Sequence, residues 1–104
     1  GVSWKGLFIK SGEGNEVKSI ASGRIVFADW MRGFGNLIIV DHGSGYMSLY
    51  GNNQALLKNV GDSVSGGDTI AAVGNSGGNE SHGLYYELRK NSVPFDPLSW
   101  SSLR

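Results

Sequence analysis

The chain has 104 residues, 39% of them hydrophobic, and its nine basic and nine acidic residues cancel. This length predicts one domain with one compact core. The zero net charge gives no global field that would attract nucleic acid, and no run approaches the roughly 18 apolar residues of a membrane-spanning helix. The absence of cysteine excludes disulfides and a thiol nucleophile. Because the first residue is Gly1 rather than Met, we expect a piece of a longer protein.

Seventeen glycines and two prolines, with many Val, Ile and Tyr residues, predict short strands joined by tight turns. The expected strands are, in chain order, 5–10, 16–21, 23–30, 36–41, 46–50 and 84–90. The turn 42–45 predicts a hairpin, and 61–74 predicts a second one. Helical character is expected only at 52–57, and Pro94 and Pro97 disfavour a regular ending. The predicted class is all-β.

Several segments, in a fixed order, carry a resemblance that covers nearly the whole chain. They are 16–26, 33–43, 48–51, 60–74 and 84–89. Together they resemble the LytM-type (M23) peptidase domain of cell-wall enzymes. The resemblance implies one antiparallel β domain over 1–104 with little helix, related to duplicated hybrid motif and barrel-sandwich folds. The family's usual segment before its first metal ligand is absent, so we expect part of the sheet to be missing.

Active members of that family hold zinc with a His and an Asp four residues apart and with the second His of a His-x-His strand. The resemblance places these positions on Trp4, Phe8, Gly83 and Tyr85, and a further family His on Asn52. Zinc takes imidazole, carboxylate or thiolate ligands. Phenylalanine and glycine offer no lone pair, an indole N–H only donates, and a neutral tyrosine is a poor ligand. The sequence therefore predicts no metal, no cofactor and no peptidase activity.

The two histidines of the chain are the remaining candidates for a metal ligand. His42 follows Asp41, but neighbours on a strand point to opposite faces. The family often has Asp-His-Gly in a structural turn, so we interpret His42 as structural. His82 lies near Glu80 in a glycine-rich loop, where a solvated side chain is expected and adventitious metal binding is the alternative.

A narrower resemblance is to the EnvC-type murein hydrolase activators. The segments that carry it are 4–6, 28–30, 47–54 and 84–89. It implies a catalytically degenerate periplasmic domain of Gram-negative cell division, which activates N-acetylmuramoyl-L-alanine amidases that split septal peptidoglycan. Such activators dock on the FtsEX complex through an N-terminal coiled coil. No sustained heptads occur here, so we expect that region to lie outside this chain and the domain to be the C-terminal part of its parent.

Strand alternation places Leu84, Tyr86 and Leu88 on one face and residues 83, 85, 87 and 89 on the other, which in the family faces the cleft. The predicted metal-free groove has aromatic walls and cationic ends. Its residues are Trp4, Lys5, Phe8, Phe34, Tyr50, Tyr85 and Arg89. We expect it to bind a regulatory helix of the amidase. Tyr50 could equally be a core residue. Phe27, Trp30, Phe95 and Trp100 are assigned to core or edge packing.

Three other functions remain open at this stage. A module that binds peptidoglycan without activating an amidase would use the same aromatic residues to stack on sugars. A surviving zinc endopeptidase would need other ligands. A lipoyl-like carrier resembles 60–74, but its turn 65–68 lacks the modifiable lysine that such carriers present.

Overall fold

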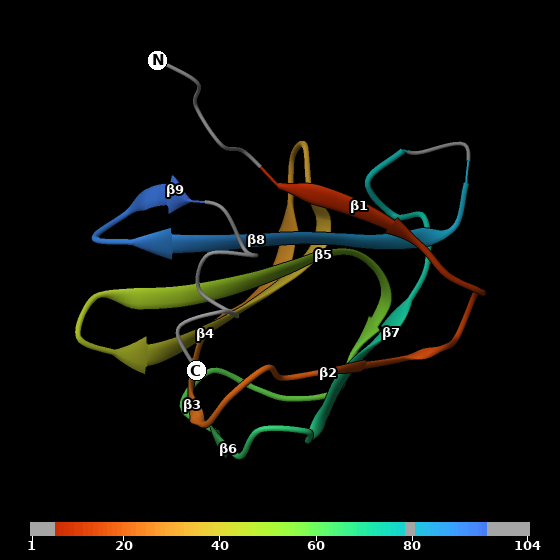
Figure 1. Cartoon of the computed structure of the whole chain (residues 1–104). Coiled ribbons are helices and arrows are strands. Elements are labelled where there is room, and N and C mark those ends of the chain that lie inside the picture. The colour runs from red at the N-terminus through yellow and green to blue at the C-terminus, as the bar shows by residue number, and fades with distance from the viewer. Residues whose placement is uncertain (1–5, 79–80, 96–104) are drawn as a thin grey trace.

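The computed structural model describes residues 6–78 and 81–95, and this part of the chain is all-β, as predicted (Figure 1). Its strands are β1 (Leu7–Lys10), β2 (Glu16–Lys18), β3 (Gly23–Met31), β4 (Gly35–Gly43), β5 (Tyr46–Leu56), β6 (Ser63–Val64), β7 (Thr69–Val73), β8 (Gly83–Lys90) and β9 (Val93–Phe95). All of their pairings are antiparallel. The described part of the chain has no helix with the length and hydrophobicity needed to cross a bilayer.

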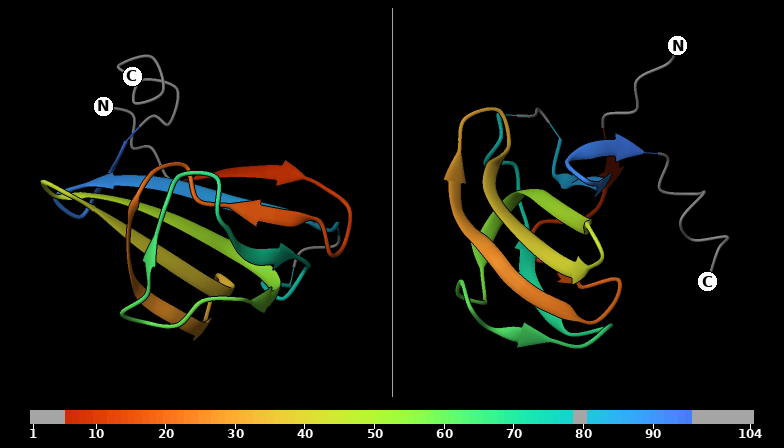
Figure 2. Two further views of the ribbon diagram at one scale, coloured as in Figure 1. Left: turned by 90° about the horizontal axis from the view of Figure 1, so that it is seen from below. Right: turned by 90° about the vertical axis from the view of Figure 1, so that its left-hand side faces the viewer.

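One sheet runs in the order β1-β8-β5-β4-β3-β6, with β7 beside β5, β2 beside β7, and β9 beside β8. The long strand β5 joins the two halves of this sheet. Its first half pairs with β4 and β8, and its second half pairs with β7. The sheet therefore curls, and β2, β6 and β7 cross beneath the layer that contains β4, β5 and β8 (Figures 1 and 2).

The hydrophobic core fills the space inside this curl. Its buried members come from six strands, and each is at most 6% exposed. They are Val17, Ile25, Ile38, Val40, Tyr50, Val64, Ile70, Ala71 and Val73. β-branched and aromatic side chains suit such a surface because they pack well against neighbours on a pleated sheet. Burial of these side chains supplies the main favourable free energy that holds β2 and β7 against the rest of the sheet.

The predicted hairpin around 42–45 is confirmed as the β4–β5 connection. Ser44 and Gly45 form its two-residue loop with φ of 53° and 83°. Positive φ at both positions is the requirement of a type I′ turn, whose twist matches that of the flanking strands. His42 fixes the base of this hairpin, because its Nδ1 lies 2.8 Å from the Ser22 carbonyl and its Nε2 lies 2.7 Å from Ser48 Oγ. These contacts are those of a structural histidine.

Three local predictions are wrong, each for a tertiary reason. Residues 52–57 are not helical, because β5 continues to Leu56 and pairs there with β7. Residues 61–74 do not form a hairpin, because β6 pairs with β3 while β7 pairs with β2 and β5. Pro94 does not end the regular structure: it lies within β9, which pairs with β8 alone among the described strands. A strand with one partner tolerates the missing N–H of a proline.

Candidate functional site

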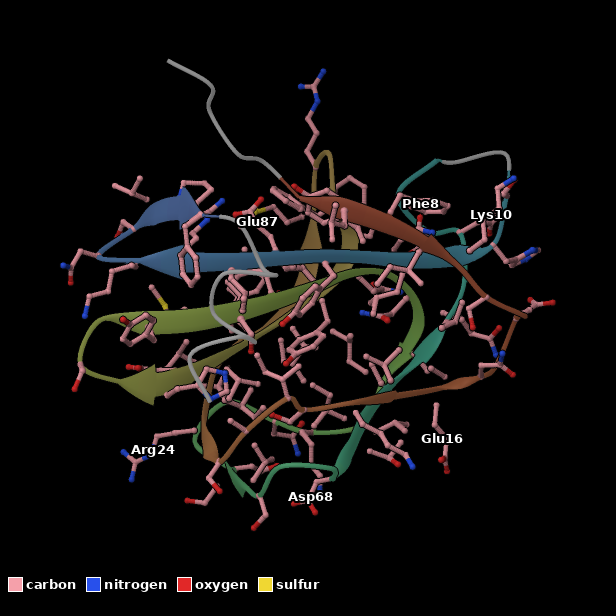
Figure 3. All side chains as sticks on the ribbon, viewed as in Figure 1. Phe8, Lys10, Glu16, Arg24, Asp68 and Glu87 are labelled. Carbon is pink, nitrogen blue, oxygen red and sulfur yellow. The ribbon has the colours of Figure 1, made fainter. Side chains whose placement is uncertain are left out.

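The first and last long segments of the described chain lie side by side, as the sequence predicts. β1 pairs with β8, and the register sets Phe8 opposite Tyr85 and Lys10 opposite Gly83. Figure 3 shows Phe8 and Glu87 along these two strands, on the side of the molecule away from Arg24. The fold thus brings together Phe8, Gly83 and Tyr85, three of the positions that the resemblance assigns to metal ligands. We call the surface formed by Phe8, Phe34, Gly83 and Tyr85 the aromatic floor.

Two aromatic rings of this region pack directly onto glycines of the opposite segment. A Cβ added to Gly83 would lie 2.6 Å from Phe8 Cζ, and one added to Gly6 would lie 2.5 Å from Tyr85 Cζ. Contacts below 3 Å cannot persist, so a larger residue at either glycine displaces the ring or the backbone. At both contacts a large ring therefore occupies the space that a glycine leaves.

Phe34 closes the aromatic floor from the turn between β3 and β4. Its ring meets that of Tyr85 edge to face, with centroids 5.4 Å apart and planes at 68°. A Cβ on Gly51 would lie 3.4 Å from Tyr85 Cδ2. Edge-to-face pairs are favourable beyond the area that they bury. The Tyr85 ring is thus held between Gly6, Gly51 and Phe34, while Phe8 remains 39% exposed.

A row of polar side chains continues the aromatic floor along β8. The Tyr85 hydroxyl donates to Glu87 Oε1 at 2.6 Å, and Arg89 Nε donates to Glu87 Oε2. Glu87 is 2% exposed, so Arg89 supplies the opposite charge that a buried carboxylate requires. Burial raises the pKa of the Tyr85 hydroxyl above its usual range, and the hydrogen bond to Glu87 raises that pKa further. Tyr85 is therefore a neutral hydrogen-bond donor at neutral pH.

The residues at these positions do not fit a zinc ion. Phe8 and Gly83 have no ligand atom. Tyr85 keeps its proton and donates a hydrogen bond to Glu87. Within residues 6–78 and 81–95, no three His, Asp or Glu side chains lie close enough to hold a metal ion together. His82 Nε2 lies 3.8 Å from Glu13 Oε1, and the two side chains are 40% and 63% exposed.

The structure corrects one residue of the predicted groove. Tyr50 is 1% exposed and belongs to the core, where its hydroxyl accepts a hydrogen bond of 3.1 Å from the Ile20 amide. Its ring packs 5.6 Å from that of Tyr86, on the face of β8 opposite to Tyr85. The prediction that Leu84, Tyr86 and Leu88 face the core is confirmed. Trp4 and Lys5, the other predicted groove residues at the start of the chain, lie outside the described residues.

Two features near the site were not predicted from the sequence. Trp30, assigned to packing, is 58% exposed near the tip of the β3–β4 hairpin that also carries Phe34. Glu87 joins Tyr85 to Arg89, a contact that their spacing of two residues along one strand could have signalled.

A shallow depression lies elsewhere, and none of its lining residues belongs to the aromatic floor. It is lined by Gly23, Arg24, Asp41, His42, Gly43 and Ser63.

Fold and site together define a β-sheet domain of the peptidase type, in which Phe8, Gly83 and Tyr85 occupy positions that the resemblance assigns to metal ligands. The chain belongs to peptidase family M23, whose model matches residues 2–97. Among solved structures, the catalytic domain of lysostaphin from Staphylococcus simulans matches with a TM-score of 0.86 and 29% identity. That match covers 93% of this chain and 77% of the lysostaphin domain.

Several curated relatives are named as murein hydrolase activators, two of them from Escherichia coli (strain K12). The murein hydrolase activator EnvC of Escherichia coli (strain K12) is 48% identical over 97 residues, which are 93% of this chain and 23% of that protein. The murein hydrolase activator NlpD of the same organism is 34% identical over 97 residues, 92% of this chain and 25% of that protein. The chain thus spans about a quarter of the length of these relatives.

Proposed function

We propose that this domain activates an N-acetylmuramoyl-L-alanine amidase in the periplasm of a Gram-negative bacterium and does not hydrolyse peptidoglycan itself. The observation that carries the proposal is the matched packing of Phe8 on Gly83 and of Tyr85 on Gly6. These rings fill the metal-ligand positions of a peptidase fold with apolar surface. The 48% identity to a protein named as a murein hydrolase activator supports the same reading.

The contact that we propose is between the aromatic floor and an amphipathic regulatory helix of the amidase. Amphipathic helices bind apolar surfaces through residues spaced three and four apart, and Trp, Tyr and Arg dominate the energetics of such contacts. Phe8 offers an exposed ring, and Arg89 lies two residues beyond the buried Glu87–Tyr85 pair along the same face. Lys5 is the second cationic residue of the proposal. Because the floor carries no metal cluster in this proposal, covering it desolvates little charge.

Activation then follows as a shift between two states of the amidase. A helix held on the aromatic floor is withdrawn from the amidase's own active site. The domain shifts the equilibrium only by the difference between its affinities for the open and the closed amidase. Recruitment through FtsEX belongs to a coiled-coil region outside this chain.

A dye-release assay on labelled peptidoglycan, with purified amidase and this domain, tests the proposal. Dye release is expected when amidase and domain are mixed. No release is expected from the domain alone, whether or not Zn²⁺ is added. Phe8→Ala and Tyr85→Ala should abolish activation with the fold intact by circular dichroism. Ile9→Ala is the matched control, because Ile9 is 46% exposed on β1 but points to the opposite face from Phe8.

Charge-reversal variants add a second test, and the choice among them depends on the buried Glu87. Arg89→Glu would place a second carboxylate beside the buried Glu87 and destabilise the domain, so Lys5→Glu is the cleaner charge reversal. Arg24→Glu, on the far side of the molecule, is its control (Figure 3). Normal activation by Phe8→Ala, Tyr85→Ala and Lys5→Glu would move the contact away from the aromatic floor.

The same aromatic surface also suits a module that binds peptidoglycan directly. Sedimentation of the domain with purified sacculi, in the absence of any amidase, separates the two functions. Tight retention without activation in the dye-release assay would favour the binding module. Stoichiometric zinc with peptidoglycan turnover by the domain alone would establish an enzyme instead.

A further inference from the structure

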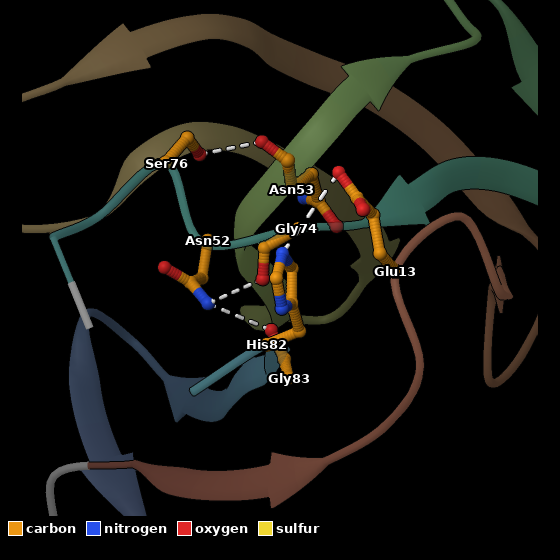
Figure 4. Close-up of polar contacts among 7 residues, drawn as sticks. All are labelled: Glu13, Asn52, Asn53, Gly74, Ser76, His82 and Gly83. Carbon is orange, nitrogen blue, oxygen red and sulfur yellow. Dashed lines mark hydrogen bonds and ion pairs between the residues drawn. The ribbon is translucent and has the colours of Figure 1, made fainter. Parts of the chain in front are cut away.

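Asn52 has a structural role that its position in the sequence does not indicate. Its side chain is 1% exposed and makes three hydrogen bonds to one distant segment, of which Figure 4 shows those to Gly74 and Gly83. Nδ2 donates to the carbonyls of Gly74 at 2.9 Å and Gly83 at 2.8 Å, and Oδ1 accepts from the Gly77 amide at 2.8 Å. One amide group thus contacts both ends and the near half of the loop that leads into β8.

The same loop is fixed again beside Asn52. Ser76 Oγ donates to the Asn53 carbonyl at 2.5 Å (Figure 4). It also accepts from the Asn36 amide at 2.9 Å. The Gly83 amide donates to the Gly74 carbonyl at 3.1 Å, which closes the loop at its base. Gly83 is the residue on which the Phe8 ring rests, so the position of the loop determines that of the aromatic floor.

The backbone of Asn52 reaches the other side of the floor. Its amide donates to the Phe34 carbonyl at 2.6 Å. Phe34 in turn packs edge to face on Tyr85. A single residue therefore connects Phe34, which packs on the Tyr85 ring, to Gly83, on which the Phe8 ring rests.

The chemistry of this position fits asparagine. Asn52 has a φ of 67°, a left-handed conformation that asparagine and glycine tolerate better than other residues. The contacts also require two donors and one acceptor on a short side chain, which an amide supplies and a carboxylate does not. Aspartate would keep the contact to Gly77 and lose those to Gly74 and Gly83, whereas glycine would keep the backbone conformation and lose all three.

We propose that Asn52 is the positioning residue of the aromatic floor: it holds the loop 74–78 and the start of β8 at a fixed place relative to Phe34, and so sets the surface that a partner helix contacts. The effect of Asn52 on partner binding rests on the proposed function. The effect of Asn52 on the loop does not, so the two effects can be tested separately.

The experiment compares Asn52→Gly and Asn52→Asp with the wild type. Asn91→Gly is the matched control, because Asn91 also has a positive φ, 51°, but lies at the exposed turn between β8 and β9. Amide hydrogen exchange of Gly77 and Gly83 is followed by NMR. In Asn52→Gly we expect exchange at both amides to accelerate by about five- to tenfold, the effect of losing roughly one hydrogen bond. In Asn52→Asp we expect Gly77 to remain protected while Gly83 exchanges faster.

Amidase affinity is measured well below the melting temperature of each variant, where a loss of global stability alone would not change it. We expect Asn52→Gly to weaken binding about tenfold and Asn91→Gly to leave it unchanged. Unchanged exchange at Gly77 and Gly83 in Asn52→Gly would overturn the positioning role. Faster exchange with unchanged affinity would overturn its consequence for binding. If the wild type binds no amidase, the proposed function fails, and the exchange data still decide the role of Asn52.

Discussion

Two tyrosines on neighbouring strands, Tyr50 on β5 and Tyr85 on β8, have opposite environments. Tyr50 is 1% exposed, and its hydroxyl accepts a bond from the backbone of residue 20, so burial fixes its identity. Tyr85 is only half-buried, and its ring lies over Gly6 beside Phe34. The core would lose its packing without the first ring, whereas the sheet pairing of β8 does not depend on the second. A large, half-buried ring that is not part of the hydrophobic core cluster is a candidate for binding.

The largest expected effect is on the stability of the core. Tyr50→Ala should lower the free energy of unfolding by about 3–5 kcal/mol, the usual range for removing a buried aromatic ring. Tyr85→Ala should lower it by about 1 kcal/mol. Urea unfolding followed by tryptophan fluorescence measures both. Equal losses would remove the distinction between core and aromatic floor.

Partner binding should show the reverse order. Tyr85→Ala is expected to weaken amidase binding by about 2 kcal/mol, roughly 30-fold, because aromatic residues at the centre of a contact dominate its affinity. Tyr50→Phe, which keeps the core ring and loses only the hydroxyl contact to Ile20, should leave binding unchanged. Isothermal titration calorimetry measures this difference. A Tyr50→Phe variant that loses as much affinity as Tyr85→Ala would show that the core participates in binding.

The packing of Tyr85 on Gly6 can be measured as a coupling energy. Gly6→Ala should cost about 1 kcal/mol, since the added methyl group displaces the Tyr85 ring. In the Tyr85→Ala background the same change should cost almost nothing, so the double-mutant cycle is expected to be non-additive. Gly12→Ala, in the exposed turn before β2, is the control. Additive losses would mean that the two residues do not depend on each other.

The smallest expected effect is at alkaline pH. The raised pKa of Tyr85 favours its neutral form in the folded state. A group of this kind stabilises the fold below its unfolded pKa, about 10, and that contribution is lost as the pH rises from there toward the folded pKa. The stability difference between wild type and Tyr85→Phe should therefore be constant near neutral pH and decline above about pH 10. Ionisation of Tyr85 at the pH of free tyrosine, followed by ultraviolet difference spectra, would contradict this.

The sequence by itself determined the all-β class, the hairpin at 42–45 and the neighbourhood of Phe8 and Tyr85. Turn chemistry is local, and the alternation of side chains along one strand is a property of the strand alone. The ordered segments that resemble M23 peptidases supplied the pairing of the first strand with the last.

Only the tertiary structure decided the rest. Residues 48 to 53 of β5 are all buried, because the curl of the sheet covers both faces of that strand, so alternation could not say on which side Tyr50 lies. Pairing with β7 likewise turned residues 52–56 into a strand. The side-chain hydrogen bonds of Asn52 join it to residues that are separated from it by 22, 25 and 31 positions in the sequence. Contacts of that separation exist only once the chain has folded.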